Sequence, residues 1–177
     1  MKKTILTFAI GFTCSFLFAQ AKSNQVNLTD PKTLLAVVRY NDLSLHEISN
    51  AAKVNEVSNK AIRDFKKTFR DAKDEKWYTL PNGYLAEFML SNRKDAVVYD
   101  KKGNWKYTIC YYDEKSLPDA VRAEVKSVYY DYSISRVEEI RVEDKIIYLV
   151  HMQNETTWKN VRVCDGEMDV IEDFNKK

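Results

Sequence analysis

The stretch Ala96–Cys110, with the sequence AVVYDKKGNWKYTIC, decides the fold of this chain. Two apolar runs flank a short polar turn that contains Gly103. Within each run the side chains point alternately to two sides, as successive residues of a strand do. Alternation around a glycine-containing turn is typical of an antiparallel β-hairpin. The other recognisable elements extend this hairpin, cover it or repeat it.

Residues 1–21 have the pattern of a secretory signal peptide. Lys2 and Lys3 precede an apolar run from Ile5 to Phe18, and Ala19-Gln20-Ala21 follows as a cleavage site. The run is too short for a stable membrane span. We therefore expect a periplasmic or secreted product. Cys14 leaves open a lipoprotein, although the apolar run continues past it and the residues before it fit a lipidation motif poorly.

Charge and hydropathy argue against a nucleic-acid partner and against a membrane span. The 28 basic residues include Lys2 and Lys3, so a chain cut after Ala21 would carry 26 basic and 26 acidic residues. A chain without net positive charge lacks the field that neutralises phosphates, and we expect no nucleic-acid partner. No second apolar run reaches membrane length, so we expect no membrane span.

Residues 22–57 form a lead-in that we expect to be partly ordered. Asp30-Pro31 and the stretch Ser44–Glu47 each resemble the start of a short helix. A first unit follows over residues 58–113. Its helix, predicted over about 59–72, buries Ile62, Phe65 and Phe69, and strands are predicted over 76–80, 84–90, 94–100 and 105–112.

The same order of elements recurs over residues 114–177. Leu117-Pro118 opens a second helix whose apolar stripe includes Val121, Val125 and Val128. Strands are predicted over 134–142, 145–153, 156–164 and 167–174. The sequence therefore predicts an α+β fold with two tandem helix-plus-four-stranded antiparallel units, their sheets continuous or side by side and both helices on one side.

Two structural details follow from this pattern. Gly83, Gly103 and Gly166 each fall at an expected hairpin, where we predict a positive φ. The predicted core comprises Ile62, Phe65, Phe69, Val121, Val125, Val128, Ala86, Phe88, Val98 and Ile109.

The sequence contains no constellation of catalytic residues. Of the two histidines, His151 lies in a predicted strand, and a secreted enzyme that uses it with a nearby thiol or carboxylate stays an alternative. Cys110 and Cys164 lie in strands that are not equivalent in the two units, so we expect them to be unbridged, with a disulfide as the alternative. We expect no enzyme and no cofactor.

The acidic C-terminal segment contains enough carboxylates to raise the question of a cation site. Its carboxylates do not follow the alternation of a calcium loop, and a solvated strand face explains them better. We therefore expect no metal at this segment, which contains Asp165, Glu167, Asp169, Glu172 and Asp173.

The order and spacing of several motifs resemble the secreted PepSY-like family, also described as beta-lactamase-inhibitor-like, over about residues 58–174. The motifs are Trp77, the A-x-F of residues 86–88, the V-x-Y-D-x-x-G-x-W of residues 97–105, Leu117-Pro118 and Tyr129-Tyr130. The resemblance implies two tandem helix-and-sheet units, a bacterial envelope location, and binding or inhibition in place of catalysis. No inhibitory residues carry over, because no inhibitory motif is identifiable here.

Aromatic residues in the predicted strands suggest an interaction surface. A sheet with helices on one face leaves its other face open to solvent or to a partner. If Ala86, Phe88, Val98, Trp105, Tyr107 and Ile109 face the helix, then Tyr78, Tyr99 and Tyr112 lead the open face, with Glu87 and Lys106 beside them. We expect a protein or peptide partner, with a structural envelope protein without a defined ligand as an alternative. The oligomeric state does not follow from the sequence.

Overall fold

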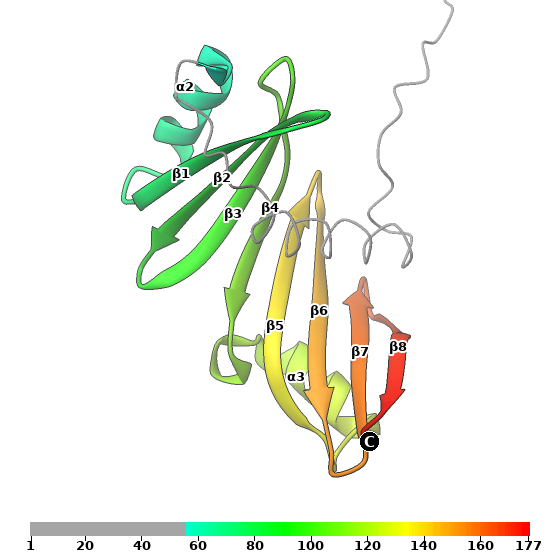
Figure 1. The fold of residues 1–177 in the computed structure, drawn as a ribbon. Helices are drawn as coiled ribbons and strands as arrows, with labels where there is room; N and C mark the ends of the chain where they lie inside the picture. Colours follow the sequence, from blue (N-terminus) through cyan, green and yellow to red (C-terminus); the bar gives the residue numbers. More distant parts are fainter. Residues whose placement is uncertain (1–55) are drawn as a thin grey trace, which may run out of the picture.

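The computed structural model describes residues 56–177. The predicted signal peptide, and the short helices expected at Asp30-Pro31 and Ser44–Glu47, lie outside the described residues. Within residues 56–177, no helix has the length and apolar character needed to cross a membrane. The described chain contains a helix followed by four strands, and this order then repeats (Figure 1).

The element boundaries agree closely with the periodicity of the sequence. The first unit consists of α2 (Asn59–Thr68), β1 (Lys73–Leu80), β2 (Gly83–Leu90), β3 (Arg93–Asp100) and β4 (Trp105–Tyr112). The second consists of the short 3-10 helix η2 (Glu114–Ser116), α3 (Asp119–Val128), β5 (Ser133–Val142), β6 (Lys145–Gln153), β7 (Thr157–Cys164) and β8 (Glu167–Asn175). The predicted α+β class is confirmed.

All eight strands form one antiparallel sheet in chain order, from β1 to β8. The two units meet where β4 pairs with β5, and there Ile109 stands opposite Ile140. Of the two arrangements that the sequence left open, the structure therefore has the continuous sheet (Figure 1). A surface on either face of this sheet can run across both units.

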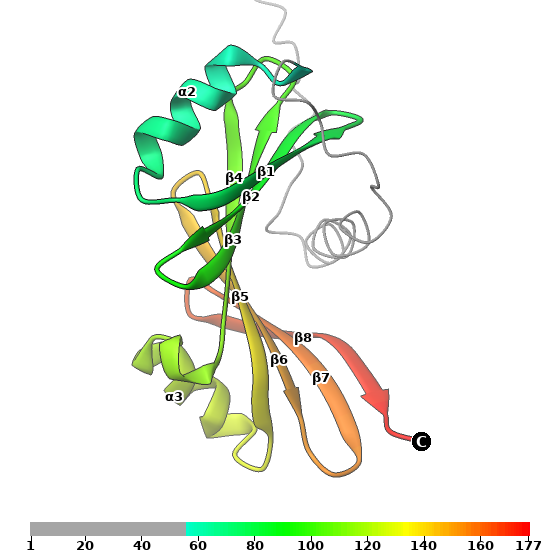
Figure 2. The ribbon, with the colours of Figure 1, turned by 60° about the vertical axis from the view of Figure 1, so that its left-hand side comes forward.

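Both helices lie on the same side of the sheet, as predicted (Figure 2). The edge strands β1 and β8 swing toward the opposite side, so that this side is concave (Figure 2). We call the side with the helices the helix face and the other side the concave face. Because side chains alternate along each strand, the register decides which residues reach each face.

The helix face holds one apolar cluster beneath each helix. Under α2, the ring of Phe65 makes edge contacts with Trp77 and Phe88, with centroids 5.4 and 5.0 Å apart. Under α3, Val125 packs on Val137 and Val150. Burying an aromatic side chain stabilises a fold by about 2–3 kcal/mol, so these contacts hold each helix to the sheet.

Six of the ten predicted core residues are buried, and Ile62, Phe69 and Val121 are partly buried and pack against the core clusters. Val128 was expected to be buried, yet it is 54 % exposed. Val128 shares the side of Val121 and Val125 by helical spacing, but it is the last residue of α3, and only Val121 and Val125 pack in the cluster beneath the helix. Val98 and Ile109 are buried as expected, but on the concave face.

Candidate functional site

The structure does not bring the five predicted surface residues to one face. Tyr78 and Glu87 lie on the concave face, whereas Tyr99 and Tyr112 lie on the helix face. The cause is the connection of β2 to β3, in which Leu90 pairs with Arg93 and only two residues form the loop. An even-numbered residue of β2 therefore stands opposite an odd-numbered residue of β3. The expected grouping of Ala86 with Val98 is wrong for this reason.

Tyr99 belongs to the core beneath α2 and has no exposed surface. Its hydroxyl donates a hydrogen bond of 3.0 Å to Oδ2 of Asp64 on the helix. Burial, and then this hydrogen bond to a carboxylate, raise the pKa of the Tyr99 hydroxyl far above its usual value of 10.0. Tyr99 therefore helps to hold α2 on the sheet. The expectation that it leads a contact surface is wrong, because its side chain is buried in the core.

Tyr112 is half-buried on the helix face, where it contacts the cluster beneath α3. Its hydroxyl donates to Oε2 of Glu139 at 2.7 Å, and the guanidinium of Arg93 lies 5.8 Å from its ring centre. Burial followed by the bond to Glu139 raises the pKa of the Tyr112 hydroxyl. The hydroxyl and the ring of Tyr112 thus both have partners within the protein, and Tyr112 does not share a face with Tyr78.

Tyr78 and Glu87 do meet, across the β1–β2 pair on the concave face. The Tyr78 hydroxyl donates to Oε2 of Glu87 at 3.2 Å, and the ammonium of Lys94 lies 2.7 Å from Oε1 of the same carboxylate. Burial, and then the charge of Glu87, raise the pKa of Tyr78. Lys106 is half-buried at the irregular start of β4. Against the effect of burial, the hydrogen bonds from Asn104 lower the pKa of Asp100, and the charge of Lys106 adds a smaller effect in the same direction.

The most exposed aromatic side chains of the concave face are Trp158 and Phe174. They stand directly opposite each other on β7 and β8, and they are 47 % and 52 % exposed. Trp158 is three residues from Val161, which packs beneath α3, so strand alternation places Trp158 on the concave face. The ammonium of Lys176 lies 4.8 Å from the Trp158 ring centre.

Sequence reasoning did not single out this pair. The face of Trp158 could have been found by counting from the apolar residues Val161 and Val163 of the same strand. Its pairing with Phe174 depends on the short turn at Asp165-Gly166 and on a register shift of the β7–β8 pair between Asn160 and Val161. The sequence does not predict this register shift.

Charged side chains form a row beside these aromatic residues. Glu138 has no exposed surface, and its Oε1 lies 2.7 Å from a guanidinium nitrogen of Arg136 and 3.2 Å from Nε2 of His151. Arg162, also buried, lies 2.9 Å from Oδ2 of Asp169. Because a buried carboxylate needs cationic neighbours, these contacts explain how Glu138 is tolerated in the sheet.

The two cysteines are free, as predicted, and they lie on opposite faces of the sheet. Cys110 faces the helices, while Cys164 packs on the concave face with Ile147 and Leu149. His151 pairs with Asn160 of β7, and Cys164 lies four residues further along that strand. At about 3.3 Å per residue, Cys164 is about 13 Å from His151 along the strand. Neither thiol is therefore within reach of the His151 imidazole.

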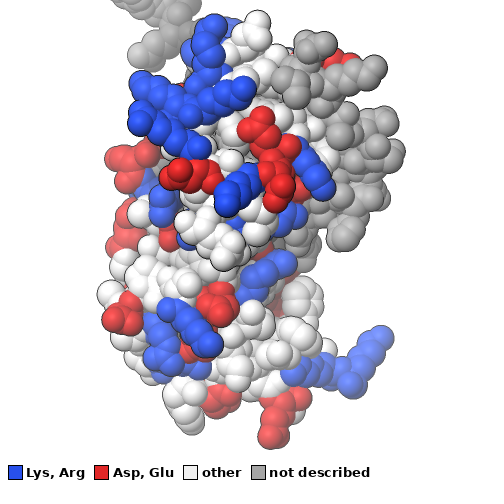
Figure 3. Space-filling model, turned by 90° about the vertical axis from the view of Figure 1, so that its left-hand side faces the viewer, with Lys and Arg blue, Asp and Glu red and all other residues white. Residues whose placement is uncertain are grey.

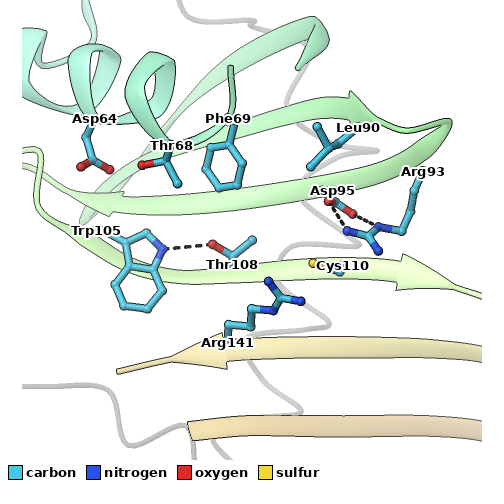
Figure 4. Close-up of a pocket in the computed structure, with 10 residues that line it drawn as sticks. All are labelled: Asp64, Thr68, Phe69, Leu90, Arg93, Asp95, Trp105, Thr108, Cys110 and Arg141. Atoms are coloured by element: carbon cyan, nitrogen blue, oxygen red, sulfur yellow. Dashed lines mark hydrogen bonds and ion pairs between the residues drawn. The ribbon is translucent and has the colours of Figure 1, made fainter. Parts of the chain in front are cut away.

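A hollow of about 410 Å³ opens on the helix face between α2 and the second unit (Figure 4). Arg93 holds the buried carboxylate of Asp95 with two contacts of 2.7 and 2.8 Å, and Trp105 donates to Thr108 at 3.0 Å (Figure 4). Burial raises the pKa of the Cys110 thiol on its floor to about 12. The thiol therefore stays protonated at neutral pH, the form that is not nucleophilic.

The described residues 56–177 contain no group of three or more His, Cys, Asp or Glu side chains that could hold a metal ion. Most of the C-terminal carboxylates contact neighbouring side chains. Asp165 binds Lys145 at 2.8 Å, Asp169 binds Arg162, and Asp173 pairs with Lys159. Glu172 accepts a hydrogen bond of 2.5 Å from the Asn160 amide.

Comparisons with known proteins identify the fold. No protein-family model matches the chain, and no curated protein does. Among solved structures it is similar to a DUF2874 family protein from Bacteroides uniformis, with a TM-score of 0.57 and 16% identity over 67% of this chain and 89% of that one. A BLIP-like protein from Bacteroides fragilis gives 0.55 and 21% over 67% and 86%.

A third similar structure is described as a candidate periplasmic protein from Bacteroides eggerthii, with a TM-score of 0.56 and 15% identity over 67% of this chain and 88% of that one. At these identities the likeness concerns the fold alone. It supports the beta-lactamase-inhibitor-like part of the resemblance drawn from the sequence, and the PepSY-like part stays a prediction.

Proposed function

We propose that this chain is an exported, non-catalytic protein that binds a protein or peptide through the concave face of its sheet. The observation that carries the proposal is the pair Trp158 and Phe174, exposed side by side on a face to which the described chain contributes no helix. Large aromatic side chains of this kind supply most of the binding energy in protein interfaces.

The surroundings of the pair are those of an interface. Around an apolar floor that includes Leu149 and Ile147, the concave face carries polar side chains with partners in the protein, such as His151 beside Glu138 and the Arg162–Asp169 pair. An apolar centre with an ordered polar rim is typical of protein-binding surfaces. Tyr78 and Glu87 lie on the same face in the first unit, so a long partner could contact both units.

Two further lines of support concern location and class. The signal-peptide pattern of residues 1–21 favours export to the periplasm or beyond. The similar fold of a BLIP-like protein favours binding over catalysis. A fold can serve several functions, and so the aromatic pair carries the proposal and the likeness adds to it.

The test is a capture experiment from envelope extract with three forms of the purified protein. In the first variant Trp158→Ser and Phe174→Ser remove the aromatic pair. In the matched control Val128→Ser and Tyr130→Ser remove two other exposed apolar side chains, which are 54 % and 82 % exposed at the end of α3. We expect the wild type and the control to retain the same partner, and the first variant to bind it at least about tenfold more weakly.

Circular dichroism and thermal melting of all three forms establish that the fold is intact. Equal capture by the wild type and the Trp158/Phe174 variant would contradict the proposal. Failure of the wild type to retain any partner would favour a structural envelope protein without a defined ligand.

A secreted enzyme is a second candidate, because His151 and Glu138 lie 3.2 Å apart. A carboxylate in contact with an imidazole can orient it as a general base. Glu138 is also held by Arg136, however, and this contact gives the carboxylate a structural role in the sheet. A hydrolytic activity of the wild type that is lost in a folded His151→Gln variant would favour the enzyme.

A further inference from the structure

The solvent side of α2 carries a concentrated positive charge. Lys60, Arg63, Lys66 and Lys67 fall within about 120° of the helix circumference, opposite the buried stripe of Ala61 and Phe65. All four are exposed, and exposed Arg70 continues the row just after the helix, where its Nε donates to the Lys67 carbonyl at 3.4 Å. We call these five residues the α2 basic face.

The α2 basic face is not neutralised by the rest of the described chain. None of its five side chains forms an ion pair with any residue between 56 and 177, although Lys60 donates to the amide oxygen of Asn104. Asp64, the one acidic residue of α2, accepts the hydrogen bond of Tyr99 at the edge of the arc. Eight cations elsewhere in residues 56–177 contact carboxylates, namely Arg93, Lys94, Arg122, Arg136, Arg141, Lys145, Lys159 and Arg162. What distinguishes the α2 basic face is that its cations without carboxylate partners lie together on one side of the helix.

The equivalent helix of the second unit shows that the fold does not require this charge. In α3, Asp119 and Glu124 balance Arg122 and Lys126. Both helices pack on the same face of the same sheet, yet only α2 carries an excess of cations. The basic face is therefore a property of α2 itself.

The neighbouring turn enlarges the positive surface. The turn between β3 and β4 contains exposed Lys101 and Lys102, and its Gly103 lies against Ser58 and Ala61 at the start of α2. In Figure 3 the Lys and Arg side chains of this region form a continuous group at the top of the molecule.

We propose that the α2 basic face binds the anionic headgroups of a lipid surface. Clusters of four to eight Lys and Arg residues are attracted to anionic lipids through the summed effect of many weak contacts. The arc of α2 presents no exposed aromatic side chain that could anchor a protein partner in a pocket, so charge alone governs recognition there. This surface lies on the helix face and is separate from the aromatic pair on the concave face.

The test is co-sedimentation of the purified exported protein with lipid vesicles. Vesicles of phosphatidylcholine alone are compared with vesicles in which about one lipid in three is phosphatidylglycerol, at about 25 mM and about 500 mM salt. We expect binding to the anionic vesicles at low salt only. The variant Arg63→Gln, Lys66→Gln, Lys67→Gln and Arg70→Gln should bind them at least about tenfold more weakly.

A matched control removes the same number of charges from the surface of the second unit through Lys115→Gln, Arg122→Gln, Lys145→Gln and Lys177→Gln. It should bind as the wild type does, and circular dichroism should show all forms folded. An equal loss in the control would mean that only net charge matters, and would overturn the proposal. Retention of soluble polyglutamate without retention of anionic vesicles would also overturn it, in favour of an acidic protein partner.

Discussion

At the scale of single residues, two tyrosine hydroxyl–carboxylate pairs connect the elements. Tyr99 joins β3 to α2 through Asp64, and Tyr112 joins β4 to β5 through Glu139. In each pair the tyrosine ring is packed in a core cluster while its oxygen keeps a polar partner. A hydrogen bond to a charged group contributes about 1.5–3 kcal/mol, enough to favour one packing of helix on sheet over others.

These pairs predict a loss of stability at alkaline pH. The folded protein raises the pKa of Tyr99 and Tyr112 above the usual value of 10.0, so folded protein keeps both protons while an unfolded chain loses them. Their contribution is complete below about pH 10 and declines as the pH rises above it. We expect the free energy of unfolding, measured by urea titration, to fall as the pH rises above about 10.

The double variant Tyr99→Phe and Tyr112→Phe removes both hydroxyls and supplies the control. Its stability at neutral pH should be lower by about 2–4 kcal/mol, and its decline above pH 10 should be shallower than that of the wild type. The same alkaline decline in both proteins would show that these two hydroxyls are not the groups responsible.

At the scale of elements, the sequence was sufficient to place the helices and strands but not to assign faces to the strands. The alternation in residues 145–153 predicts a strand with the same bounds as β6. Faces depend on loop length, and Ser91 and Asn92 form a two-residue turn with φ of 51° and 64°. With this two-residue turn, even-numbered residues of β2 share a face with odd-numbered residues of β3. With a turn one residue longer, even-numbered residues of both strands would share a face. Tyr99 was therefore expected at the surface and is found in the core.

Trp105 shows a second limit of strand parity. A register shift between Val98 and Tyr99 accompanies the start of β4, and Trp105 reaches the helix face, where it bonds to Thr108. A bulge inserts one residue into a strand and changes the face of the residues before it. The expected grouping of Trp105 with Tyr107 and Ile109 fails at this point.

Replacement by alanine should lower the stability of the fold by different amounts at two of the glycines. Gly166 has the positive φ that the sequence predicts, +76°, and there is open space around it. Gly83 does not have the expected positive φ. A Cβ on Gly83 would lie 1.9 Å from the backbone oxygen of Tyr99. Gly83→Ala should cost about 2–3 kcal/mol because backbone must move, and Gly166→Ala about 1 kcal/mol for its left-handed conformation. Urea unfolding of both variants measures this, and equal losses would contradict the assignment of the close contact to Gly83.

At the scale of the whole molecule, the pairing of β4 with β5 turns two similar units into one sheet with two long faces. The helix face carries the α2 basic face, and the concave face carries Trp158 and Phe174. Sequence periodicity could not predict that β4 pairs with β5. In the sequence η2 and α3 separate the two strands, and the alternating pattern of each strand would also fit pairing with a different neighbour. The candidate site therefore had to be located from the structure.

The measurement that tests the account most directly is a nuclear Overhauser experiment across the junction of β4 and β5. The structure places Ile109 opposite Ile140 and Cys110 opposite Glu139. We predict cross-strand contacts between the backbone protons of these pairs, with hydrogen-bonded amides of both strands protected from exchange. Absence of these contacts, with rapidly exchanging amides along β4 and β5, would mean that the two units form separate sheets, and would contradict the continuous concave face.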